Sequence, residues 1–134
     1  MKIKGLGWNI RNPFSPRKRV SVDWNWLLVI LLCAFAVAPL AQPGFFWGAH
    51  DARHSVYFLV EFDRSIQDGI LYPRWQPDYA FGYGYPFFNI YSPLAFYLGE
   101  AFHLLGLDFV AAVKVVFGLG FVLSALTMYL FARR

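Results

Sequence analysis

Two long apolar runs separated by a mixed stretch dominate the hydrophobic pattern of this chain. The first run covers residues 24–49 without a single charged side chain. The second covers residues 109–132 and contains one charge, Lys114. Because a transmembrane helix needs about 20 apolar residues, both runs are long enough to cross a bilayer. The pattern predicts transmembrane helices at residues 24–41 and 109–132.

The first apolar run has a second possible interpretation, a secretory signal peptide that is removed by cleavage. Ala36-Val37-Ala38 offers the small residues of a cleavage site, but Pro39 follows them immediately and the basic region before the run is long. These departures from the signal-peptide pattern favour an uncleaved membrane anchor.

Residues 50–68 have the pattern of an amphipathic helix. Polar side chains share one face at about 100° per residue, while Leu59, Phe62 and Ile66 share the opposite face. Gly69 supplies a C-terminal stop signal. A helix with this pattern can lie along the bilayer surface, with its apolar side toward the lipid.

A second short helix and an aromatic loop complete the stretch between the two apolar runs. Residues 93–107 are apolar apart from Glu100 and His103, and they are too few for a span. We expect these two side chains to hydrogen-bond to each other, because polar groups in apolar surroundings are usually paired. Residues 72–91 hold nine aromatic residues together with three prolines and two glycines. This composition predicts an irregular, ring-rich loop at the level of the lipid headgroups.

The distribution of charge indicates the topology. Six of the 12 lysines and arginines lie in residues 1–22, which contain no acid, whereas residues 42–108 hold seven acids and three arginines. Loops rich in lysine and arginine stay in the cytoplasm. We therefore predict an all-α protein of the cytoplasmic (inner) membrane, with a basic cytoplasmic tail at residues 1–23 and both termini in the cytoplasm. Residues 42–108 form the extracytoplasmic loop, with two amphipathic juxtamembrane helices and the aromatic loop.

Composition supports a membrane protein and excludes several other classes. Hydrophobic residues make up 58% and charged residues 15% of the chain, a balance that a soluble domain could not cover with polar surface. The single cysteine excludes an intrachain disulfide, and no metal-ligand spacing of the cysteine–histidine type occurs. The positive net charge comes from the juxtamembrane basic segment, so it does not indicate a nucleic-acid partner.

Several motifs follow one another along the chain: GAHD at 48–51, GILYPRW at 69–75, FGYGYP at 81–86, NIYSPL at 89–94 and the start of the second span near Lys114. As an ordered set, over about residues 24–134, they resemble the N-terminal part of the GT-C class of integral-membrane glycosyltransferases. The motifs are most similar to those of large bacterial membrane proteins of that superfamily that carry the label "6-pyruvoyl-tetrahydropterin synthase related", although nothing in the chain indicates pterin chemistry.

The resemblance implies that the whole protein transfers a sugar from a polyprenyl-phosphate donor at the extracytoplasmic face. Its partners would be membrane lipid, the lipid-linked sugar donor and further C-terminal spans of the same protein, because such enzymes have many spans. The chain would then be a piece of a longer protein and inactive alone. The alternative is a non-enzymatic, two-span membrane subunit that serves assembly or structure.

Asp51 is the candidate catalytic residue. Its position after the first span, together with the resemblance, implies a general base for an acceptor hydroxyl or a ligand of a divalent metal ion. His50 and His54 flank it and could complete such a metal site. The residues alone allow plainer roles, an N-cap for Asp51 and solvated side chains for the histidines. Members of the class often carry a second acid beside this one, and here His50 and Ala52 stand there instead.

Arg74, Trp75, Tyr85 and Lys114 are the candidate substrate-binding residues. Arginine grips phosphate well, and tryptophan and tyrosine rings can stack on a sugar. For Lys114 the resemblance implies contact with the donor phosphate. The alternatives are interfacial anchoring for the loop residues and, for Lys114, an ammonium that extends to the headgroups. Glu61 and Arg64, three positions apart, predict an ordinary surface ion pair.

Overall fold

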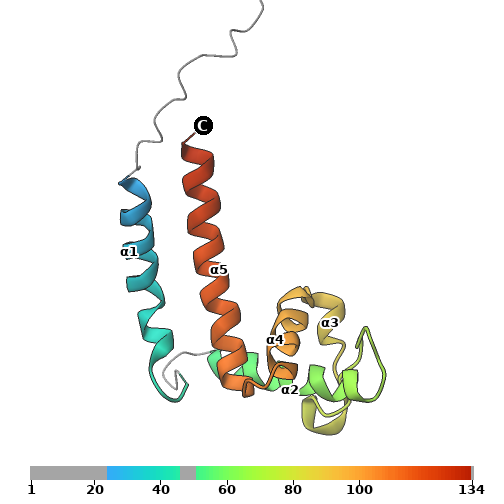
Figure 1. Cartoon of the computed structure of the whole chain (residues 1–134). Helices are drawn as coiled ribbons and strands as arrows, with labels where there is room; N and C mark the ends of the chain where they lie inside the picture. The colour runs from blue at the N-terminus through green and yellow to red at the C-terminus, as the bar shows by residue number, and fades with distance from the viewer. Residues whose placement is uncertain (1–23, 46–50, 134) are drawn as a thin grey trace, which may run out of the picture.

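Two long helices stand side by side, and a group of shorter helices gathers at one end of them (Figure 1). The computed structural model describes residues 24–45 and 51–133, so the predicted tail at 1–23 and His50 lie outside the described residues. The long helices are α1 (Asn25–Val37) and α5 (Phe109–Ala132), and they run antiparallel. Within the described part the chain is all-helical and contains no strand, which confirms the predicted all-α class.

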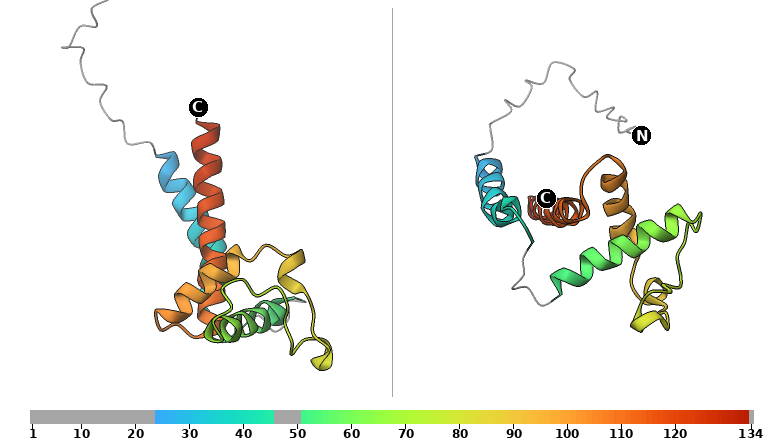
Figure 2. Two further views of the ribbon diagram at one scale, coloured as in Figure 1. Left: turned by 90° about the vertical axis from the view of Figure 1, so that its right-hand side faces the viewer. Right: turned by 90° about the horizontal axis from the view of Figure 1, so that it is seen from below.

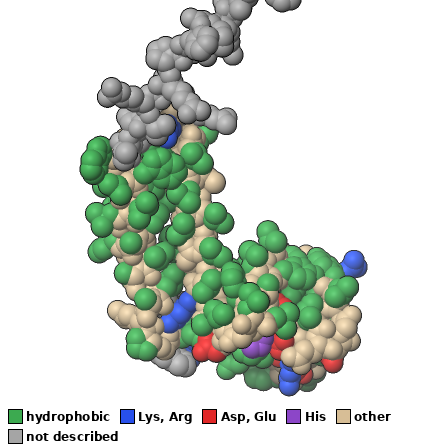
Figure 3. All heavy atoms as spheres, viewed as in Figure 1, with side chains coloured by type: hydrophobic (Ala, Val, Ile, Leu, Met, Phe, Trp, Pro, Cys, Tyr) green, Lys and Arg blue, Asp and Glu red, His purple; other side chains and the backbone are tan. Residues whose placement is uncertain are grey.

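Among the described residues, two segments are long and apolar enough to cross a membrane, Trp24–Ala41 and Phe109–Ala132. In the first, α1 continues into a 3-10 turn, η1 (Ala38–Ala41), because Pro39 has no N–H to donate and its ring disturbs the preceding turn. No residue of α1 is buried within the protein. Figure 3 shows apolar side chains covering both long helices. An apolar surface of this extent needs lipid or other protein against it.

The start of α5 is fixed by its N-cap. The Asp108 carboxylate accepts a hydrogen bond from the Ala111 backbone N–H at 2.5 Å. Gly106, at a φ of 103°, reverses the chain just before this cap, a conformation that glycine adopts without steric cost. Reversal and cap together place the first turn of α5 against the helices that precede it.

The two long helices contact each other at both ends. At one end the rings of Trp26 and Tyr129 meet edge to face, with centroids 4.5 Å apart. At the other, Lys114 Nζ donates to the Gln42 carbonyl oxygen at 2.7 Å. Between these contacts lies an apolar hollow of about 430 Å³ that includes Cys33. α1 and α5 therefore contact each other near both ends, with a hollow between them.

Residues 51–108 form a compact unit, which we call the platform. It contains α2 (Ala52–Gln67), η2 (Ala80–Gly82), α3 (Phe87–Ile90) and α4 (Leu94–Leu104). Seen along the long helices, α2 runs crosswise beside the lower end of α5, with the loop and α4 on the side away from α1 (Figure 2). α2 ends as expected, because Gly69 adopts a φ of 82° and the Ile70 N–H bonds back to the Ser65 carbonyl.

Aromatic rings from the loop form the core of the platform. Phe62 of α2 is fully buried, and the rings of Phe88 and Tyr97 stand edge to face with it at 5.1 Å and 4.8 Å. Phe87 is also buried, and its ring stacks on Phe58 at 3.7 Å. The loop is irregular, as its composition predicts, but these rings are interior packing and not headgroup contacts.

A second apolar cluster joins the platform to the second long helix. Leu59 of α2 packs with Ala112 and Val113 of α5, and all three are buried. Gly99 lets α4 approach closely, since a Cβ there would lie 3.1 Å from the Leu59 methyl groups. The platform is thus positioned by the first two turns of α5, which fixes where α2 begins relative to the long helices.

Candidate functional site

Helix α2 begins near the lower ends of both long helices (Figure 1), and Asp51 is the residue at its N-cap position. We call this end of the structure the foot. The Asp51 side chain is 86% exposed, and its Oδ1 lies 3.8 Å from His54 Nδ1. Asp51 occupies the N-cap position, yet its side chain makes no capping hydrogen bond and its φ of −105° and ψ of 2° depart from the extended geometry of a capping residue. The carboxylate therefore faces outward beside a histidine.

The predicted metal site at the foot depends on a residue outside the described part of the chain. Asp51 and His54 supply two possible ligands, but His50 is among the undescribed residues. In residues 24–45 and 51–133, no three histidine, cysteine or acidic side chains gather as a metal site. A divalent ion held by His50, Asp51 and His54 stays a prediction.

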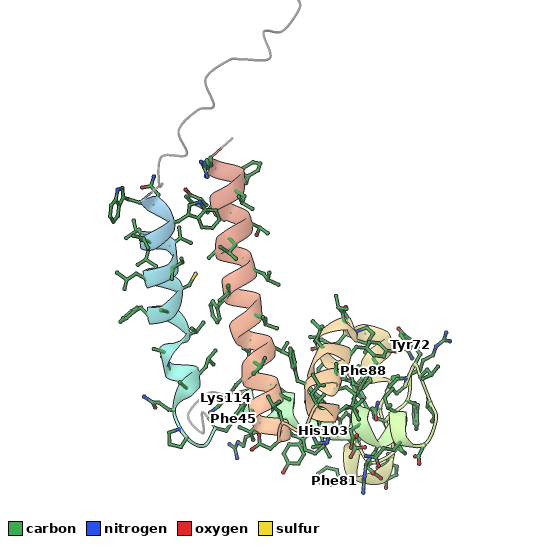
Figure 4. The ribbon with its side chains drawn as sticks, viewed as in Figure 1. Phe45, Tyr72, Phe81, Phe88, His103 and Lys114 are labelled. Atoms are coloured by element: carbon green, nitrogen blue, oxygen red, sulfur yellow. The ribbon has the colours of Figure 1, made fainter. Side chains whose placement is uncertain are left out.

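Lys114 points from the second turn of α5 toward the end of the first span, where Figure 4 places it beside Phe45. Its bond to the Gln42 carbonyl joins residues 72 positions apart in the sequence. This gives the lysine a structural role that neither of the sequence-based alternatives included. An ammonium has three N–H groups, so contact with a phosphate at the foot stays a prediction.

The aromatic-loop candidates lie together, but at the other end of α2. Gln76 and Tyr85 exchange two backbone hydrogen bonds of 2.9 Å, which brings Trp75 and Tyr85 into one hairpin-like turn. The Arg74 guanidinium lies over the Tyr72 ring, 5.5 Å from its centroid. α2 has 16 residues, a length of about 24 Å, so this group is separated from Asp51.

Gly84 supports the Trp75 ring and offers a clean test of the loop. A Cβ on Gly84 would lie 2.4 Å from three atoms of the indole, whereas a Cβ on Gly82 would meet nothing within 4 Å. Both glycines have positive φ, 80° and 88°, so the backbone cost of alanine is similar at the two sites. We expect Gly84→Ala to destabilise the platform by about 2 kcal/mol more than Gly82→Ala, measured by hydrogen exchange of platform amides. Equal effects would contradict this packing.

An acidic network lies on the outer face of α2. Arg64 pairs with Glu61 at 3.5 Å, as predicted, and also with Asp78 from the loop. Burial raises the pKa of Glu61, and Asp78 raises it further, while Arg64 opposes the shift. Burial likewise raises the pKa of Tyr79. Glu61, Arg64 and Asp78 line an open hollow of about 420 Å³. Their ion pairs hold the loop against α2.

The feature that sequence reasoning missed is a pair of buried carboxyl groups between α2 and α4. Asp63 is 6% exposed and Glu100 4% exposed. Gln67 Nε2 donates to both Asp63 oxygens, at 2.8 Å and 2.9 Å. The predicted bond between Glu100 and His103 is wrong. His103 Nδ1 bonds the Leu107 carbonyl at 2.8 Å, and neither Glu100 carboxylate oxygen accepts a hydrogen bond from any described residue.

Glu100 accordingly has an altered protonation equilibrium. Burial raises the pKa of its carboxyl group, and the adjacent Asp63 raises it further, while His103 opposes the shift. A sequence signal for this pair existed. Asp63 lies four residues after Leu59 and directly after Phe62, so a helical projection places it beside the apolar face rather than on the polar one.

Comparison with models of known protein families, with curated protein sequences and with solved structures found no match for this chain. Functional inference therefore depends on the arrangement of the residues described above.

Proposed function

We propose that this chain forms the first loop and flanking spans of a GT-C-type membrane glycosyltransferase, which transfers a sugar from a polyprenyl-phosphate donor. The observation that carries the proposal is the exposed Asp51 carboxylate at the first turn of α2, beside the ends of both long helices. An isoprenoid donor keeps its tail in the bilayer, so its phosphate and sugar must react at the membrane surface. The foot of the structure is where such a headgroup would meet a base.

The chemistry assigned to Asp51 is that of a general base. An acceptor hydroxyl would attack the anomeric carbon of the donor sugar and lose its proton to the Asp51 carboxylate, while polyprenyl phosphate leaves with the electron pair of the broken bond. His54, 3.8 Å away, would orient the carboxylate. A divalent ion, held by Asp51 and His54 together with His50, would offset the charge of the leaving phosphate.

We further propose that residues 42–108 face the extracytoplasmic side of the inner membrane and that both ends of the chain are cytoplasmic. The charge asymmetry supports this orientation, because the acids lie between the spans and basic residues flank them. Within this scheme, α2 and α4 are juxtamembrane helices. The long apolar helices on one side of the platform agree with such a placement (Figure 3).

Cysteine labelling should report this orientation. Tyr83 is 85% exposed on the loop, so in a Cys33→Ala background Tyr83→Cys should react with a membrane-impermeant maleimide in intact cells. Ser15→Cys, in the basic tail, should react only after the membrane is permeabilised. The reverse pattern would place the loop in the cytoplasm and overturn the orientation.

A transfer assay tests the function itself. The intact protein, as its gene encodes it, is reconstituted in lipid nanodiscs with a radiolabelled polyprenyl-phosphate sugar and a mixture of hydroxyl acceptors. We expect labelled product from the lipid-linked donor and none from the corresponding sugar nucleotide. Failure of every lipid-linked donor in a folded preparation would favour the non-enzymatic membrane subunit.

A further inference from the structure

The buried carboxyl pair between α2 and α4 is not used by the proposed transfer chemistry. Asp63 and Glu100 come from different helices, and both are more than nine-tenths buried. In the described part of the chain, the one hydrogen-bond donor that reaches the pair is Gln67 Nε2, and both of its contacts go to Asp63. Glu100 therefore lies beside another acid, Asp63, and its two carboxylate oxygens have no hydrogen-bond donor among the described residues.

Two adjacent carboxylates cannot both keep a charge in such surroundings. Like charges at close range disfavour double ionisation, and burial disfavours each charge separately. A single proton resolves both problems, because a protonated carboxyl group donates a hydrogen bond to its ionised neighbour. The proton then joins the two helices directly.

Among residues 24–45 and 51–133, no other charged group in the interior takes over this role. On α2, Arg64 is engaged with Glu61 and Asp78 on the outer face. On α4, His103 acts on Glu100 electrostatically, but its Nδ1 is bonded to the Leu107 carbonyl. The residues that α3 and α5 bury are apolar: Phe87, Phe88, Ala112 and Val113.

We propose that Asp63 and Glu100 form a proton-binding site in which one shared proton holds α2 against α4. This site does not depend on sugar transfer. Because α2 carries Asp51 at its start and α4 leads into α5, the bound proton stabilises the arrangement of the whole platform. Loss of the proton leaves two buried negative charges that repel each other across the interface between the helices.

The pH dependence follows from the direction of the Glu100 pKa, which is raised above its ordinary value of 4.5. The folded platform then binds more protons than the unfolded chain at pH values between the ordinary and the raised pKa. The stabilisation is complete below the ordinary value and is lost as the pH rises through the raised value. The platform should therefore be more stable in mildly acidic than in mildly alkaline solution.

The test compares the protein in nanodiscs with three variants, Glu100→Gln, Asp63→Asn and the control Asp68→Asn. An amide imitates the protonated acid and cannot ionise. We expect the melting temperature of the natural protein and of Asp68→Asn, an exposed acid on α2, to fall from mildly acidic to mildly alkaline pH. The melting temperature of Glu100→Gln should be nearly independent of pH over that range. That of Asp63→Asn should depend on pH less than that of the natural protein, because burial alone still raises the pKa of Glu100.

Infrared spectroscopy supplies a readout that does not depend on stability. At mildly acidic pH, above the ordinary pKa of 4.5, the natural protein should show the C=O stretch of a protonated carboxylic acid, and Glu100→Gln should lose this band while Asp68→Asn keeps it. The proposal is overturned if Glu100→Gln retains the pH dependence of the natural protein, or if the band is absent from the natural protein. Failure of Glu100→Gln to fold at any pH would also overturn it, because the amide would then be no substitute for the protonated acid.

Discussion

Asp51→Asn should lower sugar transfer by the intact protein at least about 100-fold, because an amide cannot accept the acceptor proton. The stability of the platform should hardly change. Asp51 is exposed and makes no capping hydrogen bond to α2, and asparagine is an equally good residue at an N-cap. Initial rates with a saturating lipid-linked donor, set beside a melting curve of the same preparation, provide the measurement.

The control for this variant is Asp68→Asn. Asp68 is exposed at the opposite end of α2, so it has the same chemistry and the same helix but lies far from the foot. It should retain full transfer. Normal transfer by a folded Asp51→Asn protein would remove the carboxylate from the reaction and leave Asp51 as a residue at a helix end.

Phe62→Ala should cost the platform about 3–5 kcal/mol, the largest loss of stability expected for any single change in the described residues. The ring is fully buried and contacts aromatic rings from α3 and α4, so its removal leaves a cavity in the middle of the aromatic core. Protection of α2 and α4 amides from hydrogen exchange should collapse. The middle of α5 should stay protected, because its packing does not involve this ring.

Phe81→Ala is the matched control for this loss. Phe81 is fully exposed at the tip of the loop, and Figure 4 shows it pointing away from the platform. Its loss should change platform stability by less than about 0.5 kcal/mol. If the two alanine variants had similar effects, the aromatic core would not be the main source of platform stability.

The long helices could be predicted from the sequence because their signals are local. α5 begins after Asp108 and ends at Ala132, as the apolar run indicates, and α2 ends at Gln67, two residues before the glycine that the pattern marks. The first span differs in one respect, since its last turn tightens at Pro39. Such features depend on a single residue or on neighbours within a few positions, so sequence reasoning reaches them.

Features that depend on tertiary contacts could not be predicted from the hydrophobic pattern of the sequence. Phe87 and Phe88 look like interfacial rings in a loop rich in proline and glycine, but they become interior once α2 and α4 close around them. Glu100 and His103 were expected to bond because they are one turn apart. Instead Glu100 meets an acid 37 positions away in the sequence, and only the crossing of two helices brings these residues together.

The candidate site residues lie in two separate groups, one at the foot and one in the loop at the far end of α2. At the foot, Asp51 Oδ1 and His54 Nδ1 lie 3.8 Å apart, and a role for these residues in sugar transfer stays a prediction. The bond from Lys114 to the Gln42 carbonyl was not foreseen. Arg74 and Trp75 come after the far end of α2, a helix about 24 Å long that begins at the foot, so one small headgroup at the foot cannot touch them. Only an acceptor large enough to extend along α2 would reach them, so a role in acceptor binding is independent of donor binding at the foot.

Contact between the lipid-linked donor and the start of α2 is the central claim, and site-specific photocrosslinking measures it most directly. A photoreactive phenylalanine analogue replaces Arg53, which is exposed and two residues from Asp51, or Tyr83, which is exposed on the loop. Each protein is irradiated in nanodiscs with radiolabelled polyprenyl phosphate. The account predicts strong labelling from position 53 and background labelling from position 83. Labelling from position 83 alone, or none above background from position 53, would contradict it.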